Sequence, residues 1–166
     1  KLYCAQISGT EDFGGDFVCK APNVGTGVRA EAVHLSWEDK RHRAGETTWL
    51  ETAGCRYRYH APLTRTIHLG RPPERLMDAA KAIVEGLDAV LDAARPGVAC
   101  EAVAAAWGRV AARHGIVKTT RIGYPVGVSY PPNWGELTAS LRPGDRTVLE
   151  AGMTFHCIPG LWSRDL

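Results

Sequence analysis

Glu51 is a carboxylate inside a stretch that reads as a β-hairpin, residues 45–70. A carboxylate that turns inward from a buried hairpin is costly unless it has a partner or a task. An ionised carboxylate can pair with a cationic group of a ligand through charge-assisted hydrogen bonds, or attack an electrophilic carbon. A salt bridge to a neighbouring arginine, Arg56 or Arg58, is the structural alternative. The sequence therefore singles out Glu51 as the first candidate for chemistry.

His34 is the second candidate, because imidazole titrates near neutral pH, as general acid–base catalysis requires. A histidine at this place could equally be an exposed or locally hydrogen-bonded loop residue. His60 and His156 are weaker candidates, and a structural role is the simpler interpretation of both.

The composition bounds the class of protein. The chain has 166 residues, enough for one domain or part of one with a sizeable core. Its 45% hydrophobic and 23% charged residues are typical of a globular protein in water. A formal net charge of +2 from scattered basic residues argues against a nucleic-acid partner. No apolar run has transmembrane length and no secretory signal is present, so we expect no membrane partner and a cytoplasmic location.

The five cysteines are odd in number and have no Cys-x-x-Cys spacing, so we expect reduced thiols packed as small apolar side chains.

The order of predicted elements indicates an α+β domain, with an antiparallel sheet and helices on one of its faces. Residues 1–45 are expected to be irregular, and Gly54 is expected to mark a bulge or a close approach in the hairpin. The predicted elements that follow are a strand pair at 45–70, helices at 72–94 and 100–114, and strands at 121–130 and 148–162.

The two helices are predicted from apolar residues spaced three to four apart. The stripe of the first helix is Leu76, Met77, Ala80, Ile83, Val84, Leu87, Val90 and Leu91. That of the second is Val103, Trp107 and Val110.

Three stretches carry a family resemblance. The hairpin ends in Thr64-Arg65-Thr66, residues 123–127 read Gly-Tyr-Pro-Val-Gly, and residues 150–160 read Glu-Ala-Gly-Met-Thr-Phe-His-Cys-Ile-Pro-Gly. In creatinase, prolidase and methionine aminopeptidase the matching motifs are Asp-x-Gly with Gly-Tyr-x-x-Asp-x-Thr-Arg-Thr, then Gly-His-Gly-x-Gly, then Glu-Pro-Gly-Met-x-Phe-x-x-Glu-Pro-Gly. The chain resembles this family from about residue 9 to residue 162. The resemblance implies the pita-bread fold, with residues 1–166 as part of a catalytic domain that lacks its N-terminal domain and final strands.

The family's metal ligands would fall on Glu51, Pro62, Tyr124 and Ile158 of this sequence. Divalent metals in hydrolases need several carboxylate or imidazole ligands at about 2.0–2.2 Å. Proline and isoleucine have no side-chain donor, and one retained carboxylate cannot build a dinuclear site. The resemblance therefore implies a hydrolase with no metal and no other cofactor.

Within this family the replacements are most similar to those of the ectoine hydrolases, which open a cyclic amidine. Further stretches of this likeness are Ser-Tyr-Pro-Pro-Asn-Trp-Gly-Glu at 129–136 and Leu-Arg-Pro-Gly-Asp-Arg at 141–146. The implied activity is hydrolysis of a C–N bond in ectoine, a small zwitterion with an amidinium and a carboxylate. A metal-dependent Xaa-Pro aminopeptidase or dipeptidase, a non-catalytic binding protein and an inert fragment are the alternatives. The full-length protein is expected to form a homodimer.

The resemblance also implies roles for individual residues. Glu51 would pair with the amidinium or attack its carbon, His34 would move protons, and the Tyr124 phenol would donate a hydrogen bond where relatives have a metal-binding histidine. The expected substrate-binding residues are Tyr130, Trp134, Glu136, His156 and Trp162. For each of these residues a purely structural role is the alternative: a packed ring, part of a surface turn or a solvated charge. Arg121 and Arg142 are both left open as partners of the substrate carboxylate.

Overall fold

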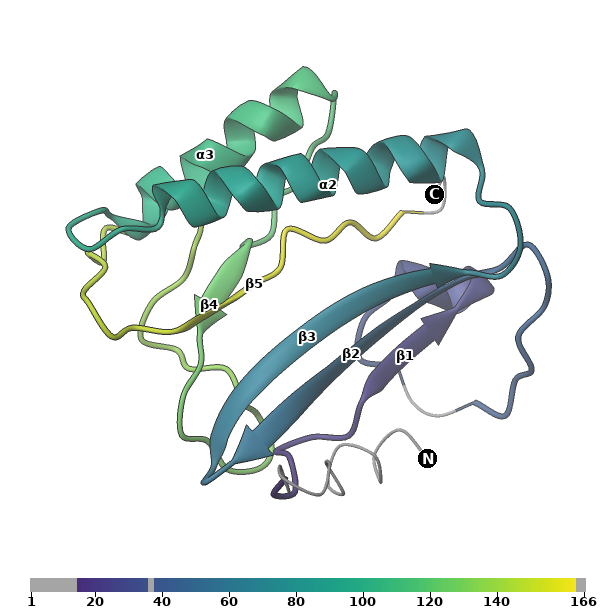
Figure 1. Ribbon diagram of the computed structural model, residues 1–166, viewed down its shortest axis with the longest axis horizontal. Coiled ribbons are helices and arrows are strands. Elements are labelled where there is room, and N and C mark those ends of the chain that lie inside the picture. Colours follow the sequence, from purple (N-terminus) through teal and green to yellow (C-terminus); the bar gives the residue numbers. More distant parts are fainter. Residues whose placement is uncertain (1–14, 36–37, 164–166) are drawn as a thin grey trace. The chain divides into compact units, whose positions relative to one another are not determined.

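The computed structural model describes residues 15–35 and 38–163 (Figure 1). The chain divides into two compact units. The first contains Lys1–Leu76, Gly127–Trp134 and Trp162–Leu166, and the second contains Met77–Val126 and Gly135–Leu161. A strand pair, two α-helices and further strands follow one another along the chain as predicted, which confirms the α+β class.

The first unit is built on an antiparallel sheet with the strand order β1-β2-β3. Its elements are β1 (Asn23–Thr26), the 3-10 helix η1 (Gly27–Glu31), β2 (Thr47–Arg56) and β3 (Tyr59–His68). The prediction of an irregular segment before residue 45 was wrong where β1 lies. This strand has only four residues and no periodicity of its own, so it forms through its pairing with β2.

β2 alternates between a buried and a more exposed face, as a strand with period two must. The buried face carries Trp49, Glu51, Ala53 and Cys55, and Thr48 is buried on the other face near the start of the strand. Gly54 lies in regular register opposite Ala61, and a Cβ placed on it would meet nothing within 4 Å. The prediction of a bulge or close approach at Gly54 was therefore wrong, because the other face of the strand carries the packing.

The two strands of the hairpin are joined by Tyr57 and Arg58, which have φ values of 49° and 67°. Positive φ at both central residues is typical of a type I′ turn, which matches the twist of the strands and favours Asn-Gly. A tyrosine and an arginine in this conformation carry backbone strain that the rest of the unit has to offset.

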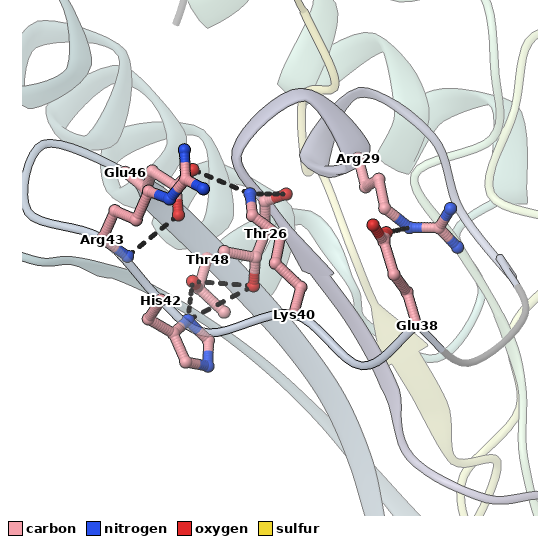
Figure 2. A network of polar contacts seen from close by, with 8 residues as sticks. All are labelled: Thr26, Arg29, Glu38, Lys40, His42, Arg43, Glu46 and Thr48. Atoms are coloured by element: carbon pink, nitrogen blue, oxygen red, sulfur yellow. Dashed lines mark hydrogen bonds and ion pairs between the residues drawn. The ribbon is translucent and has the colours of Figure 1, made fainter.

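Polar contacts tie the segment before β2 to the sheet (Figure 2). Lys40 Nζ lies 2.7 Å from Glu46 Oε1, and the Arg43 backbone N–H donates to Glu46 Oε2 at 3.0 Å. Thr26 and Thr48, paired across β1 and β2, have their hydroxyl oxygens 3.1 Å apart. These contacts hold the chain where it enters β2.

The second unit contains α2 (Glu74–Ala93), which enters it at Met77, α3 (Cys100–Arg113), β4 (Gly123–Pro125) and β5 (Phe155–Cys157). The residues 103, 107 and 110 predicted for one face of α3 are all buried. The stripe predicted for α2 was partly wrong, because Met77, Val84 and Leu91 are exposed. The buried residues of α2 are Ala82, Gly86 and Val90.

The buried face of α2 differs from the predicted one for a steric reason. The Trp107 ring of α3 packs directly on Gly86. A Cβ on this glycine would lie 2.2 Å from the ring. Around this contact the core contains Val90, Cys100, Val103, Leu141 and Leu149. None of the helices in the described part of the chain combines the length and apolarity that a membrane crossing demands.

Candidate active site

Glu51 lies at the centre of β2, on the buried face of the sheet, with 6% of its surface exposed. Its Oε2 atom accepts a hydrogen bond from Asn23 Nδ2 at 2.7 Å, across the β1–β2 ladder. The same oxygen lies 3.6 Å from the ammonium of Lys20. The salt-bridge alternative considered from the sequence is therefore real, and Lys20, which was not considered there, takes part in it.

Lys20 brings three other side chains together. Its Nζ lies 3.3 Å from Nε2 of His34, 3.6 Å from Glu51 Oε2 and 4.4 Å from the centre of the Trp134 ring. The Lys20 side chain is 23% exposed, and Trp134 is completely buried. We call Glu51, Lys20, His34 and Trp134 the lysine cluster.

His34 is an exposed residue with a φ of 59°, and it meets Glu51 through the shared ammonium. Lys20 was not predicted as a site residue, because no motif or periodicity in the sequence marks it.

A short stretch before β1 delivers Lys20 to this cluster. The Asp16 backbone N–H donates to the Cys55 carbonyl at 2.7 Å, and the Cys19 N–H donates to His60 Nε2 at 3.2 Å. The guanidinium of Arg58 donates to the carbonyl of Phe17. These bonds fasten residues 16–20 to the end of the β2–β3 hairpin.

A second segment, residues 127–134, delivers Trp134 in the same way. The His60 N–H donates to the Gly127 carbonyl at 3.1 Å, and the Ser129 N–H donates to the Arg58 carbonyl at 3.0 Å. Arg58 Nη2 returns a hydrogen bond to the Ser129 carbonyl at 2.8 Å, and the Ser129 hydroxyl donates to the Trp134 carbonyl at 3.1 Å. Arg58 therefore binds both segments that carry members of the lysine cluster.

His60 is a structural residue. Its Nδ1 lies 2.9 Å from the Arg58 carbonyl while Nε2 accepts from the Cys19 N–H, so both ring nitrogens are used by the neutral tautomer with a proton on Nδ1. Burial lowers the pKa of His60 below its usual value and favours this uncharged form.

In the second unit Tyr124 and His156 lie opposite each other on β4 and β5. The Tyr124 hydroxyl is 2.9 Å from His156 Nδ1, and the two rings are nearly perpendicular, at 84°. Both residues are buried, with 8% and 6% exposed. The Arg121 guanidinium lies 4.3 Å from the centre of the Tyr124 ring. The phenol and the imidazole can thus exchange a proton directly.

The remaining predicted substrate-binding residues have contacts within their own units. Tyr130 is 65% exposed and stacks at 4.8 Å against Arg58. Trp162 meets Trp49 edge-on, with ring centres 6.3 Å apart. Glu136 is half-buried, with one carboxylate oxygen 3.5 Å from the Thr138 hydroxyl.

The donor set does not fit a divalent metal ion. Within residues 15–35 and 38–163, no three His, Cys, Asp or Glu side chains lie close enough to share one. In the first unit Pro62 stands opposite Ala53, next to the Glu51–Thr64 pair and on the same face of the sheet, where it offers no donor. The Lys20 ammonium lies 3.6 Å from the Glu51 carboxylate and provides a positive charge there.

The chain is similar in sequence to known proteins of one family. The profile of metallopeptidase family M24 matches residues 3–165. The chain is 49% identical to the ectoine hydrolase of Halomonas elongata over 92% of its own length, and 46% identical to the uncharacterized hydrolase/peptidase y4tM of Sinorhizobium fredii over 97%. It covers 39% and 41% of these two proteins, so it spans about two fifths of their length.

Among solved structures, the prolidase of Thermococcus sibiricus matches with a TM-score of 0.80 at 22% identity, over 93% of this chain and 41% of that one. This match shows the creatinase- and prolidase-like fold that the sequence motifs implied. The profile match over nearly the whole sequence and the two relatives above 45% identity show that the chain belongs to metallopeptidase family M24.

Proposed function

We propose that the protein is a hydrolase of this family that opens the cyclic amidine ring of ectoine without a metal ion. The observation that carries the proposal is the buried Glu51 carboxylate, held by Asn23 and neutralised by Lys20, on a strand pair where the family's second metal ligand is replaced by Pro62. The likeness to the ectoine hydrolase of Halomonas elongata supports the choice of substrate.

The reaction needs addition to the amidinium carbon, cleavage of one ring C–N bond and transfer of a proton to the departing amine nitrogen. Glu51 can act in two ways. It can neutralise the amidinium while water adds, or its own oxygen can form the bond to carbon and give an intermediate that water then hydrolyses. Both routes consume one water molecule and give a ring-opened N-acetyl-diaminobutyrate.

Proton transfer is assigned to imidazole and phenol groups. His34 meets Glu51 through Lys20, and Tyr124 is hydrogen-bonded to His156. An imidazole that titrates near neutral pH can take a proton from water and return it to the amine nitrogen. The Tyr124–His156 pair of the second unit is a further proposed proton-transfer group, and its own hydrogen bond supports this role.

Replacement of Glu51 by glutamine in the full-length protein tests the proposal. The amide keeps the size of the side chain but can neither neutralise an amidinium nor attack its carbon. Loss of a charge-assisted contact alone costs roughly 1.5–3 kcal/mol and weakens affinity with residual turnover. Loss of a nucleophile abolishes turnover while binding persists. Glu150→Gln, which changes an exposed carboxylate, is the control and is expected to leave ring opening unchanged.

Product formation is measured by following ectoine and the ring-opened products by NMR. Wild-type rates in Glu51→Gln would refute a role for this carboxylate. Metal-stimulated cleavage of Xaa-Pro dipeptides, without ectoine turnover, would favour the dipeptidase alternative.

A further inference from the structure

We infer that Lys20 binds the carboxylate of the substrate, so that the Glu51–Lys20 pair selects a small zwitterion over a simple cation. The inference rests on the proposed function and deepens it, because it names the group that reads the second charge of the ligand. Arg121 and Arg142 were the residues considered for this task from the sequence.

The Lys20 ammonium has the hydrogen-bonding capacity to bind a ligand oxygen. An ammonium has three N–H donors. Among the described residues it lies within hydrogen-bonding distance of His34 Nε2, at 3.3 Å, whereas the 3.6 Å separation from Glu51 Oε2 is an ion pair too long for a direct hydrogen bond. Donor capacity therefore remains at an ammonium that is still 23% exposed. A ligand oxygen can use it.

The charges of Glu51 and Lys20 also favour a ligand that carries both a cation and a carboxylate. Glu51 is buried, and Lys20 compensates its charge when no ligand is bound. An amidinium that pairs with Glu51 takes over this compensation and leaves the ammonium without its anion, which is costly in a partly desolvated position. A ligand that brings its own carboxylate restores the balance, so a zwitterion is favoured over a cation of the same shape.

Lys20 is held in place by Trp134 as well as by Glu51. Its ammonium stands 4.4 Å from the centre of the Trp134 ring, whose indole is completely buried, and such a cation–π contact persists when the carboxylate turns to a ligand. Arg121 is instead stacked on Tyr124, and Arg142 is exposed. Lys20 is the cation whose position next to Glu51 the structure fixes.

The test compares two ligands in the full-length protein: ectoine and its carboxamide, which keeps the ring and amidinium but has no negative charge. Affinities are measured by calorimetry, and kcat/KM by NMR. The wild-type protein is expected to prefer ectoine. Lys20→Met should lower affinity for ectoine roughly 10- to 100-fold, the equivalent of one charge-assisted hydrogen bond. Affinity for the carboxamide should not fall and should rise if loss of the anion partner of Lys20 is costly, because the variant has no ammonium to leave unpaired.

Lys40→Met is the matched control, because Lys40 also pairs with a glutamate of the same unit and its side chain is 24% exposed (Figure 2). It should keep the preference for ectoine. Lys20→Arg retains the charge and should keep part of the preference, which separates loss of charge from failure to fold.

If Lys20→Met loses the same affinity for ectoine and for its carboxamide, while the wild-type protein turns over ectoine, this inference is overturned and the proposed function stands. In that case Lys20 would act only by positioning Glu51. A wild-type protein that neither binds nor opens ectoine would overturn the proposed function and this inference with it.

Discussion

The turn of the β2–β3 hairpin offers a sharp test of how the lysine cluster is assembled. Tyr57 and Arg58 are adjacent, both have positive φ, and both would be less strained as glycine. Relief of a left-handed conformation is worth roughly 1–2 kcal/mol, and the flexibility that glycine adds to the unfolded chain takes back about 0.5–1 kcal/mol. The backbone effect of Tyr57→Gly and Arg58→Gly is therefore nearly the same.

Their side chains differ greatly. Tyr57 is 76% exposed, and its ring has a cation–π contact with Arg56 at 5.3 Å, worth about 0.5–1 kcal/mol at an exposed site. Arg58 donates hydrogen bonds to the carbonyls of Phe17 and Ser129. Hydrogen bonds to a charged group contribute about 1.5–3 kcal/mol each, at the lower end where solvent reaches them. We expect Tyr57→Gly to change stability by less than about 1 kcal/mol and Arg58→Gly to destabilise by roughly 2–4 kcal/mol.

Urea unfolding followed by tryptophan fluorescence measures the difference. With a slope of about 1–3 kcal/mol per molar, Arg58→Gly should lower the midpoint by about 1 M or more, and Tyr57→Gly should leave it nearly unchanged. Arg58→Gly should also weaken ectoine binding, because it releases the segments that carry Lys20 and Trp134. Equal midpoints for the two variants would refute the reasoning, since the backbone effect is nearly the same in both and the contacts of the guanidinium would then add no net stability.

Two further predictions concern the second unit. Gly86→Ala should destabilise the protein by about 1–3 kcal/mol in thermal or urea unfolding, because its Cβ would lie 2.2 Å from the Trp107 ring, whereas Gly108→Ala, with open space around it, should stabilise by up to about 1 kcal/mol; a stabilised Gly86→Ala would contradict the packing. Burial lowers the pKa of Lys118 from its usual 10.5 to about 8, so the charged form penalises the folded state fully below about pH 8 and the penalty is relieved as pH rises toward 10.5. The stability gained by Lys118→Met over the wild type should therefore be largest below pH 8 and shrink above it, and a gain that does not vary with pH would show that desolvation of the ammonium is not its source.

The sequence predicts what local patterns encode. The hairpin and both helices were placed within a few residues, because β-prone residues, Pro-Pro and Arg-Pro-Gly boundaries and 3–4 spacing are all local signals. β1 was missed since it exists only through its partner. Gly25 lies so close to Trp49 that a Cβ would sit 2.5 Å from the indole nitrogen, and no sequence period reports such a contact. The buried face of α2 was misjudged for the same reason.

The candidate site divides along the same line. Glu51 was identified because the family resemblance aligns it with a metal-binding aspartate, and its place in β2 puts it on the buried face of the strand. Lys20 could not be found in this way. Its place depends on hydrogen bonds that join Arg58 and His60 to residues about forty positions earlier in the chain, donated by the Arg58 guanidinium and accepted by His60 Nε2. Neither side chain is part of a recognisable motif. In the first unit, Glu51, His34 and Trp134 were predicted as separate candidates, and Lys20, which was not predicted, contacts all three.

The lysine cluster also explains how a metal-binding strand pair can keep one carboxylate after its other ligands are replaced. A buried carboxylate without compensation is unstable, and in the M24 relatives that the motifs resemble metal ions would provide the positive charge. Here Asn23 and Lys20 provide a hydrogen bond and an ammonium to the same oxygen of Glu51, which makes the pair neutral before any ligand arrives. Such a pair binds a simple cation poorly, because the cation would leave the ammonium without its anion, but it is complementary to the two charges of a zwitterion. The replacement of the metal ligands and the charge pattern of the proposed substrate thus follow from one requirement, that the charge of Glu51 stays balanced in both the empty and the occupied state.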